Sequence, residues 1–126
     1  MSDIEPVRVL IVDDEEDSRV LLADLLSDLP EIEVVGAAQT VEEAVELVAL
    51  MRPRVAIVDW MMPGGGGPKA ANQIVAASPE TRVLGISGGD PTHASYEMMQ
   101  GGATGFVSKG CSSEELLDSI RSVTRW

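Results

Sequence analysis

Five short, mostly apolar segments alternate with segments of helical periodicity along the sequence, and four of the five stop at a polar residue. They are Val7–Val12, Ile32–Val35, Val55–Val58, Val83–Ile86 and Phe106–Ser108. Their apolar residues are largely consecutive rather than alternate, as is typical of strands buried on both faces. Because alternating strands and helices build a parallel sheet with helices on both sides, the sequence predicts an α/β fold of five βα units.

Apolar residues spaced three or four apart predict a helix after each strand. These helices are expected around Leu22–Leu29, Val41–Val48, Ala70–Val75, Tyr96–Met99 and Leu116–Val123. Thr40 with Glu43, and Ser112 with Glu115, match the capping box that opens a helix. The glycine run Gly64–Gly67 is expected to be a flexible lead into the third helix.

Length and charge narrow the class of protein. The length of 126 residues suits one domain over residues 1–126. Twenty-one acidic residues against nine basic ones give a net charge of −12, which disfavours binding to nucleic acid or to anionic membranes. We expect no signal peptide and no membrane span. The single cysteine, Cys111, allows no internal disulfide and suits a cytoplasmic location.

Polar residues gather at the carboxyl ends of the expected strands. They are Asp13, Asp14, Asp59, Ser87 and Lys109. In an open α/β sheet, ligands bind outside these ends, where the strand order reverses. If the five strands follow the common order 2-1-3-4-5, this point lies between the first and third strands, so three carboxylates should converge there.

Three close carboxylates repel one another, so the cluster suggests a hard cation, and oxygen ligands of this number suit Mg²⁺. A carboxylate beside such a cation can attack phosphorus, and Asp59 is the candidate nucleophile. Lys109 can balance the charge that develops on the phosphoryl group, and Ser87 can donate a hydrogen bond to it. Each residue alone has an ordinary interpretation as a turn, loop or surface residue; together they predict phosphoryl transfer.

Three other conspicuous residues carry no such prediction. His93 has no second ligand at metal spacing and is expected to be exposed. Trp60 and Trp126 are expected to be packing or surface residues. The glycine run does not form a phosphate-binding loop, because no Lys-Ser or Lys-Thr follows it in register.

Over essentially its whole length the sequence resembles the receiver domains of bacterial two-component response regulators. The resemblance is carried by Val9–Asp14, Asp59, Met62–Pro63, Gly67, Ser87–Gly88 and Phe106–Lys109. Ile32–Ala37 and Gly101–Phe106 resemble the LuxR-type branch. The resemblance implies a flavodoxin-like fold with a parallel sheet in the order 2-1-3-4-5.

The resemblance also implies residue roles. Asp59 would accept a phosphoryl group from a sensor histidine kinase. Asp14 and Asp59 would bind Mg²⁺ through their side chains, Asp13 mostly through water, and Met61 through its backbone carbonyl. Such a domain is not an enzyme with a separate substrate; it catalyses only its own phosphorylation and dephosphorylation.

Ser87 and Phe106 would be the switch pair. The hydroxyl turns toward the phosphate and the ring moves inward, which changes the face formed by the fourth helix, fifth strand and fifth helix. That face would control an output domain or a partner, and dimerisation on phosphorylation is open. The sequence departs from the family's frequent residues at Ser87 (threonine), Phe106 (tyrosine), Gly110 (proline) and Gly64–Gly66 (often a polar residue).

Two other classes compete with this interpretation. Haloacid-dehalogenase-type phosphatases use similar groups, but they place the nucleophile after the first strand and the acidic pair late, which is the reverse of the order here. A degenerate receiver would bind partners without phosphate, yet no site residue is missing. The output is open among a DNA-binding domain, a cyclic-dinucleotide enzyme and a stand-alone receiver, as are the cognate kinase and the oligomeric state.

Overall fold

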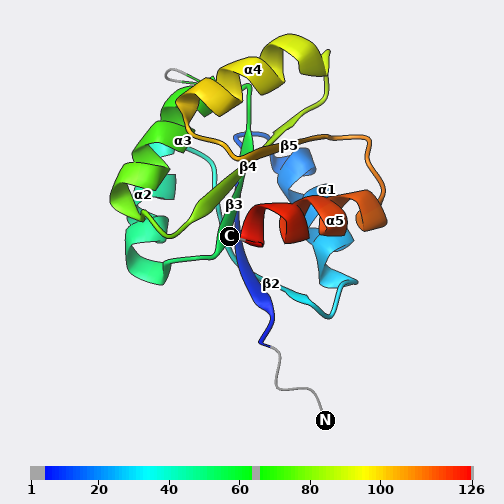
Figure 1. Ribbon diagram of the computed structural model, residues 1–126. Helices are drawn as coiled ribbons and strands as arrows, with labels where there is room; N and C mark the ends of the chain where they lie inside the picture. The colour runs from blue at the N-terminus through cyan, green and yellow to red at the C-terminus, as the bar shows by residue number, and fades with distance from the viewer. Residues whose placement is uncertain (1–4, 64–65, 126) are drawn as a thin grey trace.

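The computed structural model describes residues 5–63 and 66–125, and it contains a five-stranded parallel sheet flanked by five helices (Figure 1). The strands are β1 (Val7–Val12), β2 (Ile32–Ala38), β3 (Val55–Asp59), β4 (Arg82–Ser87) and β5 (Gly105–Ser108). The helices are α1 (Glu16–Ser27), α2 (Val41–Met51), α3 (Gly66–Ala77), α4 (Pro91–Gly101) and α5 (Ser113–Thr124). The sheet order β2-β1-β3-β4-β5 confirms the predicted flavodoxin-like topology.

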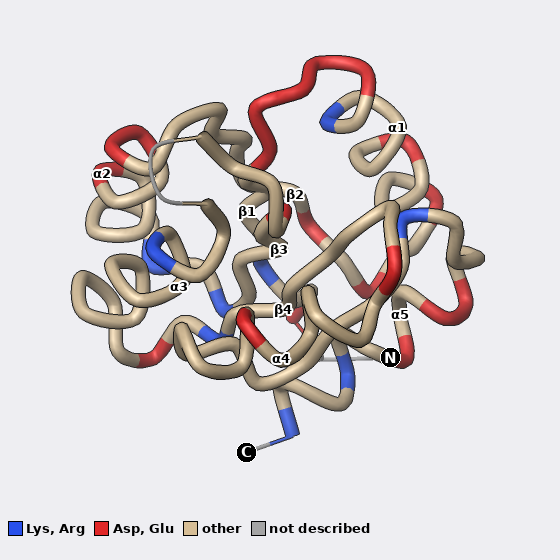
Figure 2. Tube along the Cα trace, turned by 90° about the horizontal axis from the view of Figure 1, so that it is seen from above, with Lys and Arg blue, Asp and Glu red and all other residues tan. Residues whose placement is uncertain are grey.

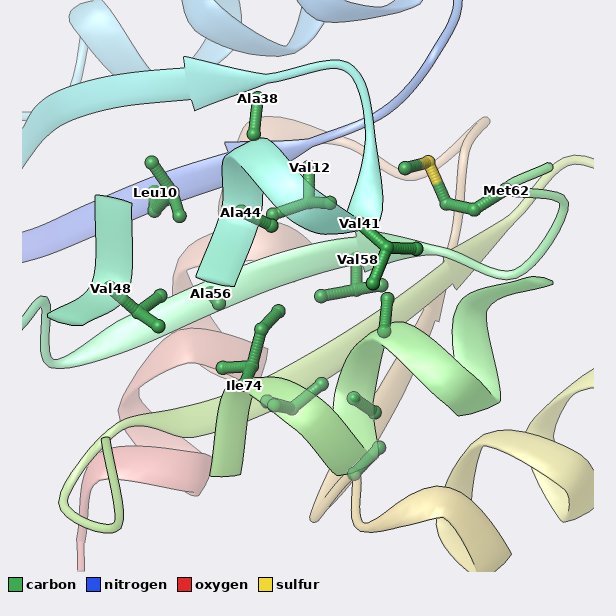
Figure 3. Packing of buried hydrophobic residues seen from close by; sticks show 14 of the residues in the cluster. Leu10, Val12, Ala38, Val41, Ala44, Val48, Ala56, Val58, Met62 and Ile74 are labelled. Atoms are coloured by element: carbon green, nitrogen blue, oxygen red, sulfur yellow. The ribbon is translucent and has the colours of Figure 1, made fainter. Parts of the chain in front are cut away.

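Two hydrophobic clusters lie on opposite faces of the sheet. Val9 and Ile11 of β1 pack with α1 and α5. Leu10 and Val12 face α2 and α3 (Figure 3), and Met98 of α4 belongs to their cluster. All four β1 side chains are fully buried. Burying an aliphatic side chain contributes about 1.5–3 kcal/mol, so the consecutive apolar residues that predicted the strands also hold both helix layers in place.

The second strand is longer than its sequence suggests. It continues past Gly36 to Ala38, because β1 and β2 pair through a register shift between Val9 and Leu10. Val9 pairs with Val34 and Leu10 with Gly36, so one residue of β2 is skipped. The prediction that this strand ends at Val35 was wrong, since main-chain pairing with β1 continues through a glycine.

The two predicted capping boxes differ in outcome. At α5, Ser112 Oγ accepts a hydrogen bond from Glu115 N (3.1 Å) and the Glu115 carboxylate accepts one from Ser112 N (2.9 Å), which confirms the box. At α2, Thr40 accepts from Glu43 N (3.0 Å), but the Glu43 carboxylate accepts from Gln39 N (2.7 Å). At α2, therefore, only the Thr40 half of the predicted capping box forms.

The described part of the glycine run belongs to a helix. Gly64 and Gly65 lie outside the described residues, as does Trp126, whereas Gly66 and Gly67 form the start of α3. Gly67 lies directly on the backbone at the end of β3: a Cβ there would be 2.5 Å from Asp59 O and 2.7 Å from Trp60 Cα. The described half of the run is thus a site of close packing and not a flexible lead.

Within residues 5–63 and 66–125, no helix has both the length and the apolar character that crossing a bilayer requires.

We expect Gly67→Ala to lower the free energy of unfolding by about 1–3 kcal/mol, the usual effect of overpacking. Alanine favours a helix over glycine by only about 1 kcal/mol, so the clash with the Asp59 backbone prevails. Gly110→Ala is the matched control, because nothing lies within 4 Å of a Cβ at that position. Urea unfolding measures both; equal stabilities of the two variants would contradict the close approach.

Candidate functional site

Three carboxylates meet at the carboxyl edge of the sheet. Asp59 is the last residue of β3, and Asp13 and Asp14 directly follow the neighbouring strand β1. One carboxylate oxygen from each lies within 4.8 Å of the other two. Asp13 and Asp59 are only 2% and 4% exposed, whereas Asp14 is open to solvent. The sequence prediction that these side chains converge is confirmed.

The acidic cluster extends into the next helix. Residues 13–17 are all acidic, and they form the continuous red stretch that leads into α1 in Figure 2. Backbone N–H groups fix the two buried carboxylates: Glu15 N donates to Asp13 Oδ1 (2.9 Å) and Met61 N to Asp59 Oδ1 (3.2 Å). Each of these carboxylates therefore keeps its other oxygen, Oδ2, for the interior of the site.

Lys109 joins the two buried carboxylates. Its Nζ lies 3.2 Å from Asp13 Oδ2 and 3.2 Å from Asp59 Oδ2. The lysine follows β5, and its backbone N–H donates to Ser87 O on β4 (2.9 Å). The Lys109 ammonium group, which follows edge strand β5, thus reaches the carboxylates at the ends of β1 and β3.

Burial and neighbouring charges shift the proton affinities of this group. Burial raises the pKa of Asp59, and the negative charge of Asp13 raises it further, although the Met61 N–H and Lys109 oppose both effects. Burial by itself would lower the pKa of Lys109, but the charges of Asp59 and Asp13 outweigh it and raise that pKa. Lys109 therefore carries its positive charge at neutral pH.

Ser87 and Phe106 lie on neighbouring strands beside this cluster. Ser87 ends β4, is buried, and its Oγ accepts a hydrogen bond from Gly89 N (3.2 Å). Phe106 is half-buried and pairs in register with Gly85. A Cβ on Gly85 would lie 2.9 Å from Phe106 Cδ1 and 3.1 Å from Met98 Cγ. The missing side chain at position 85 therefore leaves room for the ring between β4 and α4.

A contact that sequence reasoning missed starts at the residue after Asp59. Trp60 Nε1 donates to Glu97 Oε1 on α4 (3.1 Å), and the Trp60 and His93 rings meet edge to face at 5.9 Å. His93 Nε2 lies 3.5 Å from Glu97 Oε2, and its side chain is 69% exposed, as predicted. The four-residue spacing of His93 and Glu97 was visible in the sequence, but their partner Trp60 was not.

The donor set of the acidic cluster fits a hard divalent cation. Asp13, Asp14 and Asp59 offer only oxygen ligands, as Mg²⁺ prefers, and Lys109 alone does not balance their three negative charges. Met61 stands two residues after Asp59 and its side chain is 70% exposed, so it does not wall off the cluster. The arrangement can bind a cation together with a phosphoryl group.

In a flavodoxin-like sheet the ligand site lies where the strand order reverses, and an acidic cluster with a lysine occupies that place here, as the chemistry of a phosphoryl-accepting signalling domain requires. The model of the response regulator receiver domain matches residues 9–121. The chain therefore belongs to the response regulator receiver family and is a receiver domain of phosphorylation-dependent two-component signalling.

Relatives and solved structures agree with this assignment. The chain is 32% identical to response regulator GacA of Pseudomonas aeruginosa over 117 residues, which are 93% of this chain and 55% of that protein. It is 33% identical to response regulator UvrY of Escherichia coli, with 93% and 54% covered. The chain thus spans about half the length of these relatives.

Two solved receiver structures superpose on nearly the whole chain. The signal receiver domain of the NarL response regulator of Mycobacterium tuberculosis gives a TM-score of 0.87 at 33% identity, covering 96% of this chain and 98% of that one. The response regulator domain of Thermotoga maritima CheB gives 0.84 at 31% identity, covering 97% and 98%.

We expect Asp59→Asn to melt a few degrees higher than the wild type in EDTA at pH 8. The raised pKa means that folded Asp59 holds its proton more readily, so its contribution to stability is lost as pH rises through that pKa. The difference in melting temperature between Asp59→Asn and the wild type should therefore be smaller at pH 5 than at pH 8. Asp14→Asn should gain less, because Asp14 is exposed.

Asp118→Asn is the control for net charge, since the Asp118 side chain is 78% exposed on α5. Thermal melts by circular dichroism measure all four proteins. If both site variants melt lower than the wild type in EDTA, the carboxylates do not repel one another as the structure indicates.

Proposed function

We propose that Asp59 is the phosphoacceptor and that a sensor histidine kinase is the donor. The observation that carries the proposal is the placement of Asp59 at the end of central strand β3, 3.2 Å from Lys109 Nζ and within 4.8 Å of Asp13 and Asp14 oxygens. The Asp59 carboxylate, the Lys109 ammonium group and a site for a metal cation would then lie next to one another. Phosphoryl transfer requires this combination.

In this proposal, Asp14 and Asp59 hold Mg²⁺ through their side chains, Asp13 does so through water, and Met61 contributes its backbone carbonyl. When bound, Mg²⁺ neutralises part of the charge on the phosphoryl oxygens. An Asp59 carboxylate oxygen attacks phosphorus, the P–N bond to the kinase histidine breaks, and an acyl phosphate forms on Asp59.

Two further residues act on the transferred group. Lys109 pairs with a phosphoryl oxygen once the Asp59 oxygen that it contacts has become esterified. Ser87 donates its hydroxyl to a second phosphoryl oxygen, for which its Oγ must leave the Gly89 N–H. Hydrolysis of the acyl phosphate returns Asp59 to its starting state, so the domain catalyses only its own phosphorylation and dephosphorylation.

The signal leaves through the face formed by α4, β5 and α5. When Ser87 turns to the phosphoryl group, the ring of Phe106, which already lies beside Gly85, moves further inward to fill the space that the hydroxyl leaves. This face controls an output domain or a partner, with dimerisation as one form of that control. The site of action is the cytoplasm, where the free thiol of Cys111 stays reduced.

Incubation with Mg²⁺ and a small phosphodonor should add one acid-labile phosphoryl group to the wild type, and excess EDTA should prevent it. Asp59→Asn should accept none, whereas the control Asp118→Asn should react like the wild type. Intact-protein mass spectrometry measures the adduct. An unchanged mass for the wild type, with Mg²⁺ bound, would refute the proposed acceptor.

Ser87→Ala should still accept the phosphoryl group on Asp59. Its conformational response should be weak, because the hydroxyl that turns toward the phosphoryl group is gone. We expect amide chemical-shift changes at residues 101–106 to fall to less than half of the wild-type values when beryllofluoride and Mg²⁺ are added. Ser95→Ala is the control, since its hydroxyl donates to Thr92 O one turn earlier in α4 and makes no hydrogen bond to β4 or β5 among the described residues. Equal shifts in the Ser87 variant and the wild type would rule out this coupling.

A further inference from the structure

A side-chain hydrogen bond joins Trp60, the residue that follows Asp59, to helix α4. The indole Nε1–H of Trp60 donates to Glu97 Oε1 (3.1 Å). Glu97 is the one acidic residue of α4, and its side chain is 43% exposed. Among the described residues, no other side-chain hydrogen bond connects α4 with another element of the fold. The bond therefore links α4 to the chain directly beside Asp59.

The backbone of Trp60 is fixed on both sides. Its N–H donates to Ile86 O on β4 (2.9 Å), and its C=O accepts from Gly67 N at the start of α3 (2.8 Å). The next N–H along the chain, that of Met61, donates to Asp59 Oδ1 (3.2 Å). Only two side-chain torsions separate the indole from this backbone. A shift of α4 away from Trp60 must therefore break the bond or disturb the peptide that holds Asp59.

Other contacts of α4 are apolar or steric. Met98 is fully buried in one of the two hydrophobic clusters, and a Cβ on Gly101 would lie 2.5 Å from Pro68 O of α3. Apolar burial is non-directional, so it allows a helix to shift slightly. A hydrogen bond weakens steeply once its angle leaves the favoured range. The bond between Trp60 and Glu97 is therefore the contact that a movement of α4 would break first.

His93 is the lesser partner of Glu97. Its Nε2 lies 3.5 Å from Glu97 Oε2, and its side chain is 69% exposed. An exposed ion pair contributes little to stability. The His93 ring also meets the Trp60 ring edge to face at 5.9 Å, so it packs beside the hydrogen bond. Trp60 thus provides the main restraint on the Glu97 carboxylate.

We propose that Trp60 and Glu97 form a latch that stabilises the unphosphorylated position of α4 and restrains phosphoryl transfer to Asp59. Both are positioning residues, and the inference rests on the proposed function. The latch connects the two segments that this function moves: the Met61 peptide, which meets Mg²⁺, and α4, which carries the response. Because coupling between two sites is reciprocal, phosphorylation opens the latch, and opening the latch favours phosphorylation.

The Trp60 indole N–H reports the latch directly in ¹⁵N–¹H NMR spectra, because the bond to Glu97 slows its hydrogen exchange with water. The chain has a second tryptophan, Trp126, and Trp60→Phe identifies which signal belongs to which residue. We expect the Trp60 signal of the wild type to lose its protection when beryllofluoride and Mg²⁺ are added. Glu97→Leu should lack protection from the outset, whereas Glu97→Gln, which keeps an acceptor oxygen, should retain it.

The rate of phosphorylation by acetyl phosphate in Mg²⁺, followed by intact-protein mass spectrometry, tests the effect on transfer. Glu97→Leu and Trp60→Phe should each raise the rate about two- to tenfold, the effect of one net hydrogen bond. The double variant should be no faster than either single variant, since both remove the same bond. Glu97→Gln should react like the wild type, as should the control Glu46→Leu, which replaces an exposed carboxylate of α2.

Three results would overturn the latch while the wild type still accepts a phosphoryl group. The first is indole protection that beryllofluoride leaves unchanged although residues 101–106 respond. The second is a rate for Glu97→Leu equal to or below that of the wild type. The third is an equal acceleration in Glu97→Gln and Glu97→Leu, which assigns the effect to charge.

A wild type that takes up no phosphoryl group rejects the proposed function together with the latch. Glu97→Leu decides the matter if Trp60→Phe does not fold, because Trp60 packs against a hydrophobic cluster whereas Glu97 is half-exposed.

Discussion

The ion pairs of Lys109 with Asp13 and Asp59 are the interaction on which the site depends. Parallel strands bring their carboxyl ends to one edge, so β1 and β3 must place their carboxylates together. Without a cation this edge would oppose folding, since like charges disfavour the compact state. Lys109 offsets part of the repulsion, and a divalent cation bound there, as proposed, would offset the remainder.

The parallel sheet brings charged residues together at both of its edges. A chain of net charge −12 gathers buried acid at the carboxyl edge and arginines at the amino edge. The helix layers follow the same polarity, because in βα units each helix begins near the carboxyl edge and ends near the amino edge. Arg8 and Arg54 accordingly meet backbone carbonyls at the ends of α2 and α5. The carboxyl edge is thus mainly acidic and the amino edge mainly basic, while apolar side chains form the two clusters between them.

The sequence pattern correctly predicted features that depend on residues close together in the chain. It failed for features that depend on a segment distant in the sequence. The apolar segments and the Ser112–Glu115 box were predicted correctly, since each is encoded within a few positions. The end of β2 was misplaced because pairing with β1 extends the strand past Gly36. The contact of Trp60 with Glu97 was missed, because it joins residues 37 positions apart.

By itself the sequence determined the order of strands and helices, the burial of both sheet faces and the position of each polar residue at a strand end. These features follow from apolar periodicity, which is a local property. The tertiary structure decided the distances: Lys109 lies 3.2 Å from two carboxylates, and Gly67 lies against the Asp59 backbone. These depend on strand register and helix packing, which arise only when residues distant in sequence bury surface against one another.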